Sequence, residues 1–81
     1  MARVYFPDHL TRFTEGTREL DVGAATFREL VAELEGQFPA LAGQLLGKVA
    51  VAIDGDIVHD PFLESIGRDS EVYFLHRIEG G

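Results

Sequence analysis

Alternating apolar and polar side chains open the chain and predict its first strand. In Ala2–Phe6, Val4 lies on one face and Tyr5 on the other, as the two-residue period of a strand requires. A turn-rich segment, 7–17, follows, and Arg18–Val22 then alternates again over a shorter length. We expect the two strands to form a hairpin, with the charged second strand at an edge of the sheet.

A helical period replaces this alternation after Thr26. Thr26 and Glu29, three residues later, have the spacing of a capping box, in which each side chain accepts a hydrogen bond from a free backbone N–H. Pro39 ends the pattern because proline cannot continue a helix. We expect a short helical turn after it, with Leu41 and Leu45 packed inward. The apolar stripe of the predicted helix consists of Phe27, Leu30, Val31, Leu34 and Phe38.

The second half of the chain predicts another hairpin and a last strand. Lys48–Ile53 and Asp56–Val58 are separated by Asp54-Gly55, a pair that tolerates the positive φ angles of a two-residue turn. Glu71–Ile78 carries apolar residues on both faces, which is typical of a central strand. Between these elements we expect a loop that contains a helical turn around 62–66.

This order of elements predicts an α+β fold. The amphipathic helix must cover one face of the sheet, and a right-handed crossover places the second hairpin beside the first. The last strand then inserts between the hairpins, parallel to the first strand. We therefore predict a β-grasp (ubiquitin-like) fold, a mixed five-stranded sheet with one main helix on one face. Residues 1–75 would form the domain and 76–81 a C-terminal tail.

Composition narrows the class of protein. The chain has 81 residues and no cysteine, which excludes a disulfide scaffold, a thiolate metal site and a cysteine nucleophile. Fourteen acidic residues outnumber seven scattered basic ones, so nucleic acid is not an expected partner. An acidic surface suits a protein partner with a basic docking site, or it only keeps the chain soluble. Without a signal peptide or an apolar run long enough to cross a membrane, we expect a cytoplasmic protein.

The polar residues do not form a catalytic or metal-binding pattern. His9, His59 and His76 are far apart in the sequence and lack the spacing of metal ligands. The chain also lacks a glycine-rich phosphate loop and an arrangement of nucleophile and base. We therefore expect no catalytic residues, no metal and no bound cofactor, and we do not expect the chain to be an enzyme on its own.

Two glycines follow directly on the last predicted strand and end the chain. With this end, the whole sequence resembles the MoaD/ThiS family of small ubiquitin-like sulfur carriers. The segments that carry the resemblance are Ala2–Phe6, the capped helix with the following 37–41, the hairpin 49–58, the strand entry 69–72 and Gly80-Gly81.

The resemblance implies a chemistry for the end of the chain. In such carriers, an adenylating enzyme similar to ubiquitin-activating enzymes uses ATP-Mg to join AMP to the terminal carboxylate, here that of Gly81. A sulfur donor then replaces AMP, which leaves a thiocarboxylate that is delivered to a synthase or another acceptor enzyme. Gly80, Glu79 and Ile78 would form the tail that enters the partner. Glycine suits this position because it is narrow and its backbone is unrestricted.

The sequence says less about which pathway receives the sulfur than about the carrier chemistry. The length resembles the small subunit of molybdopterin synthase, so molybdenum cofactor biosynthesis is the expected pathway. Thiamin, cysteine, tRNA-thiolation and secondary-metabolite pathways are alternatives, because 76–79 departs from the small or proline residues of many relatives. A ubiquitin-like modifier conjugated through Gly81, or an interaction module without carrier chemistry, are the other candidate functions.

A second candidate site follows from the predicted sheet. If Val4 and Phe74 face the helix, the two-residue period places Tyr5, Tyr73 and Leu75 on the opposite face, where Ile57 joins them. A fold with one helix leaves that face partly open, and exposed apolar residues of this kind often mark a protein interface. We expect it to dock the adenylating enzyme or the synthase.

Overall fold

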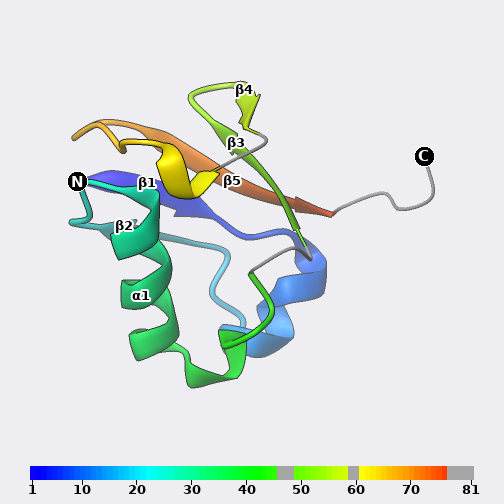
Figure 1. Cartoon of the computed structure of the whole chain (residues 1–81). Helices are drawn as coiled ribbons and strands as arrows, with labels where there is room; N and C mark the ends of the chain where they lie inside the picture. Colours follow the sequence, from blue (N-terminus) through cyan, green and yellow to red (C-terminus); the bar gives the residue numbers. More distant parts are fainter. Residues whose placement is uncertain (46–48, 59–60, 77–81) are drawn as a thin grey trace.

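The protein is a five-stranded sheet with one helix across one of its faces (Figure 1). The computed structural model describes residues 1–45, 49–58 and 61–76. The strands are β1 (Ala2–Tyr5), β2 (Glu19–Val22), β3 (Val49–Ile53), β4 (Asp56–Val58) and β5 (Glu71–His76). The helices are α1 (Phe27–Gln37) and the short 3-10 helices η1 (Asp8–Phe13), η2 (Pro39–Leu41) and η3 (Pro61–Leu63).

The strand order is β2-β1-β5-β3-β4, so the last strand occupies the centre of the sheet. β5 runs parallel to β1, with Val4 beside Val72, and antiparallel to β3, with Val51 beside Phe74. The predicted β-grasp topology is therefore confirmed. β5 also includes His76, the first residue of the expected tail.

The start of α1 has the capping pattern that the sequence predicts, with one shift. The backbone N–H of Glu29 donates to Thr26 Oγ1 at 3.1 Å. At the other end, the helix stops at Gln37, and Phe38 separates it from Pro39. The Glu29 carboxylate accepts from the backbone N–H of Ala25 at 3.0 Å, one residue earlier than in a standard capping box. Both side chains thus fix the point at which the chain enters the helix.

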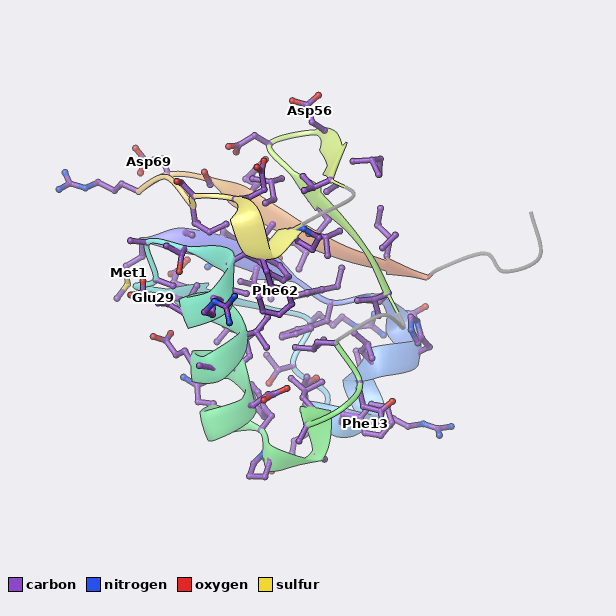
Figure 2. The ribbon with its side chains drawn as sticks, in the orientation of Figure 1. Met1, Phe13, Glu29, Asp56, Phe62 and Asp69 are labelled. Carbon is purple, nitrogen blue, oxygen red and sulfur yellow. The ribbon has the colours of Figure 1, made fainter. Side chains whose placement is uncertain are left out.

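The core lies between α1 and the sheet. Phe74 stands at its centre, with ring centroids 6.0 Å from both Phe6 and Phe27. Phe62 from η3 closes one side by packing edge-to-face on Phe27 at 5.4 Å (Figure 2). Leu10 from η1 closes another side and is fully buried, more deeply than the turn-rich sequence around it suggests. These contacts hold the helix and both loops against one face of the sheet.

The segment after η3 differs from the sequence-based expectation. The helical turn ends at Leu63, and the chain then becomes extended, with Ser65 bridged to Thr26. The backbone N–H of Ile66 donates to the carbonyl of Ala25 at 2.8 Å. This tertiary pairing, which local helical preference does not reveal, straightens the chain before β5.

The β3–β4 turn also holds the start of β5. Asp54 and Gly55 have φ angles of 51° and 89°, as the predicted two-residue turn requires. The Asp54 carboxylate accepts from the backbone N–H of Glu71 and from the Ser70 hydroxyl, both at 2.9 Å. Asp54 therefore joins the turn to the central strand, a role that sequence reasoning missed because Ser70 is 16 residues away.

Candidate functional site

The last described residues form the base of the predicted tail. Leu75 and His76 pair with Ala50 and Val49 of β3, so β3 directs the end of β5. Because the strand also pairs with β1 along its first half, its path is held on both sides. The predicted tail residues, Ile78, Glu79, Gly80 and Gly81, lie outside the described residues.

The sheet face opposite α1, which we call the open face, carries all four predicted docking residues. Three of them lie in one row across four strands, in which Tyr5 of β1 is beside Tyr73 of β5, and Ala52 of β3 separates Tyr73 from Ile57 of β4. Leu75 lies two residues further along β5, toward the end of the chain. Ile57 is 57% exposed and Tyr73 36%, and among the described residues only Met1 is a more exposed large hydrophobic residue.

Tyr5 and Tyr73 stack against one another on this face. Their ring centroids are 4.4 Å apart and their planes differ by 8°. The Tyr5 hydroxyl also donates to Glu71 Oε2 at 3.4 Å. Desolvation raises the pKa of Tyr73, and the negative charge of Glu71 raises it further. The stacked pair therefore presents a flat aromatic surface on the open face.

A charged cluster borders the tyrosines at the β2 edge. Arg3 donates to Glu19 at 2.7 Å and to Asp21 at 3.1 Å. The hydrogen bond to Asp21, together with the charges of Asp21 and Glu19, raises the pKa of Arg3. Arg3 also lies beside Glu71 in the register of β1 and β5. Sequence reasoning missed this cluster, although the alternation that placed Tyr5 on the open face also places Arg3 there.

The described residues offer little for other kinds of site. No group of three or more His, Asp or Glu side chains among them is arranged to hold a metal ion. His9 lies in η1 and His76 at the end of β5, while His59 lies outside the described residues. Within the same part of the chain, no helix has the length and apolar character needed to cross a bilayer.

Several solved protein structures have the same fold as this chain. A chain of the Amycolatopsis orientalis BexX/CysO complex has a TM-score of 0.87 at 17% identity, with 100% of both chains covered. Small archaeal modifier protein 1 from Methanosarcina acetivorans has a TM-score of 0.84 at 18% identity, covering 99% of this chain and 95% of that one. A chain of the complex of subunits 1 and 2 of the Helicobacter pylori molybdopterin-converting factor has a TM-score of 0.71 at 19% identity, covering 99% of this chain and 97% of that one.

The sequence comparisons identify the family. No curated protein matches the chain. The model of the ThiS family matches residues 4–81, from the first strand to the last glycine. The chain therefore belongs to the ThiS family, whose members are small ubiquitin-like carrier proteins.

Proposed function

We propose that this chain is a cytoplasmic sulfur carrier whose Gly81 carboxylate is adenylated and then converted to a thiocarboxylate. The observation that carries the proposal is the ThiS family match, which extends through Gly81. The position of β5 supports it, because β1 holds the first half of the strand and β3 holds it up to His76, which gives the tail a defined starting point. Fixing that start lowers the ordering cost when the tail enters a partner.

The proposed chemistry has two steps. A Gly81 carboxylate oxygen attacks the α-phosphorus of ATP-Mg in the adenylating enzyme, and the bond from that phosphorus to the β-phosphate oxygen breaks to release pyrophosphate. A hydrosulfide then attacks the acyl carbon, so that a C–S bond forms and the C–O bond to AMP breaks. AMP leaves with the electron pair, and the hydrosulfide proton passes to solvent. No oxidant or reductant is needed when the donor is hydrosulfide.

The length of the tail fits this role. The five residues after His76 reach at most about 17 Å when fully extended. That reach brings the carboxylate into the interior of an enzyme while the folded domain stays outside. A side chain at Gly80 or Gly81 would widen the tail where the passage is narrowest.

The open face is the proposed docking surface for the adenylating enzyme and, later, the sulfur acceptor. Tyr5, Ile57, Tyr73 and Leu75 lie on the same face, and Leu75 is close to the point where the tail begins. An enzyme that covers these residues would therefore receive the tail at one end of the contact. Two of the similar structures are themselves complexes of two proteins.

The acceptor pathway is the finer part of the proposal. We place molybdopterin synthesis first, on chain length and on the likeness to the molybdopterin-converting factor complex. The likeness to a chain of the BexX/CysO complex makes a partner of the BexX kind the next candidate to test. Thiamin, cysteine and tRNA-thiolation pathways complete the series. Purified acceptors of each class, supplied with the thiocarboxylate form, would identify which one consumes it.

A second function, conjugation to other proteins through Gly81, is favoured by the likeness to small archaeal modifier protein 1. It shares the adenylation step but ends in an amide bond to a lysine of the target. High-mass adducts of the carrier in cells, absent when Gly81 is deleted, would support the modifier. A third possibility, an interaction module, requires that deletion of Gly80-Gly81 leaves function unchanged.

The main test is intact mass spectrometry after incubation with ATP-Mg, adenylating enzymes from the same organism and sulfide. We expect a mass gain equal to the replacement of one oxygen by sulfur, located in the C-terminal peptide. Deletion of Gly81 should abolish the gain. A matched control is Gly36→Ala, because an added Cβ at this exposed helical glycine meets no atom within 4 Å. If no such enzyme produces an adenylate or a thiocarboxylate, the carrier proposal is wrong.

A further inference from the structure

The open face has a strongly uneven charge. Glu19, Asp21 and Glu71 surround Arg3 at one corner, and we call these four residues the acidic corner. Three carboxylates against one guanidinium leave two negative charges. Arg3 is already shared between two of the carboxylates, and among the described residues Glu71 forms no ion pair with a basic side chain.

The acidic corner is continuous with the apolar row of the open face. Tyr5 lies beside Glu19 in the register of β1 and β2, and its hydroxyl donates to Glu71. The corner lies at the start of β5, whereas Leu75 lies toward its end. Leu75 lies four residue steps along the strand from Glu71, which is about 13 Å. The face therefore has a charged end and an apolar end, and the apolar end is the one nearest the tail.

We propose that the acidic corner orients the partner, and that the occupant of the open face is the adenylating enzyme, with an apolar centre and basic side chains opposite this corner. This inference rests on the proposed function. An apolar contact alone tolerates rotation of one surface on the other, because burial of apolar area is not directional. A charged contact at one end removes that freedom, since a rotated partner would leave the carboxylates desolvated and unpaired.

Charge also argues against a second copy of this chain as the occupant. On the described part of the open face, Arg3 is the only basic side chain, and it is already paired with Glu19 and Asp21. Each of the two copies would also carry a net charge of −7 over its whole chain. A basic protein surface satisfies the corner, whereas a like-charged copy would be repelled.

The test measures the rate constant for association of this chain with the adenylating enzyme, the one that modifies Gly81 in the mass assay. The double variant Glu19→Gln/Asp21→Asn removes two charges from the corner. The matched control, Glu33→Gln/Glu35→Gln, removes two charges from α1, on the other side of the sheet. At low salt, we expect the corner variant to associate about tenfold more slowly than wild type, and the control to change little.

Two further measurements test the effect of charge on the association rate: its dependence on salt, and a variant that makes the acidic corner more negative. The difference between the two double variants should shrink as salt rises from about 0.01 M to about 0.15 M, because the screening length falls from about 30 Å to about 8 Å. Arg3→Gln makes the corner more negative and should associate faster than wild type. Thermal unfolding of each variant shows that the fold is intact.

Several outcomes would overturn the inference. Equal slowing of the corner and α1 variants would mean that only total charge matters. Faster association of Glu19→Gln/Asp21→Asn, or a stable homodimer through the open face in sedimentation, would mean that the occupant is not a basic partner. If wild type still acquires sulfur in these cases, the carrier function stands and only the orienting role fails. Absence of any Gly81 modification would instead overturn the proposed function.

Discussion

The two faces of the sheet are built from the same strands, but their apolar side chains lie in opposite environments. Along β5, Val72 and Phe74 are 0% and 1% exposed beneath α1, whereas Tyr73 between them is 36% exposed. Neighbouring residues of one strand thus lie in different environments, one in the core and the next in contact with solvent. The covered face holds the fold together, while the open face keeps apolar area that the isolated chain does not need for its core.

This contrast shows how a small domain separates stability from recognition. A two-residue period gives every strand two independent sets of side chains. Substitutions on the covered face should therefore reduce the free energy of unfolding. Substitutions on the open face should change partner binding with smaller effects on folding.

The largest expected effect is on the covered face, at Phe74. Replacing Phe74 with alanine removes a ring that contacts both Phe6 and Phe27 and leaves a cavity. We expect a loss of about 3–5 kcal/mol in the free energy of unfolding, measured by urea denaturation. A loss below about 1 kcal/mol would contradict the central position of Phe74 in the core.

The neighbouring residue provides the opposite test. Tyr73→Ala should lower stability much less than Phe74→Ala, because the ring is partly exposed. It should weaken binding of the adenylating enzyme by about tenfold or more, as expected for an aromatic residue in a docking surface. Ile57→Ala tests the β4 end of the apolar row in the same binding assay. Unchanged affinity in both variants would remove the open face as the docking surface.

The helix cap tests whether the covered face can be weakened without affecting the open one. Thr26→Ala removes the acceptor for the Glu29 N–H and should cost about 1 kcal/mol of stability. Thr26→Ser keeps the hydroxyl and is the matched control, with little expected change. Affinity for the adenylating enzyme should stay the same in both variants when measured well below the unfolding temperature. A loss of affinity in Thr26→Ala alone would show that the two faces are coupled.

The smallest expected effect concerns ionisation of Tyr73. In a Tyr5→Phe background, phenolate absorbance reports Tyr73 alone, since the chain has two tyrosines. Its midpoint should lie above the ordinary value of 10.0, and Glu71→Gln should lower it by removing a nearby negative charge.

The same pKa shift has a consequence for stability. The folded chain holds the Tyr73 proton more tightly than the unfolded chain does. The contribution of Tyr73 to the free energy of unfolding is therefore fully present below pH 10.0. It is lost as the pH rises through the pKa that Tyr73 has in the folded chain, which lies above 10.0. A midpoint at or below 10.0 in the Tyr5→Phe background would contradict both the raised pKa and this alkaline loss.

Most of the fold follows from local patterns in the sequence. The two-residue and helical periods, the Thr26–Glu29 spacing and the Asp54-Gly55 turn each act over a few residues, so they can be recognised without the rest of the chain. The apolar character of β5 on both faces also indicated its central position. The ThiS family match agrees with the resemblance, whereas the roles of Gly81 and of the docking residues stay predictions.

What the sequence determined by itself was therefore the elements, their order and the face on which each strand residue lies. The tertiary structure alone decided which residues of separate strands lie side by side. Tyr5 donates to Glu71, 66 residues away, only because the register of the parallel β1–β5 pair places Tyr5 beside Tyr73, two residues along the strand from Glu71. That register is defined only when the first and last strands of the chain pack side by side. The tyrosine stack, the acidic corner and the Asp54–Ser70 contact arise from this packing, because no local preference encodes a distance across the chain.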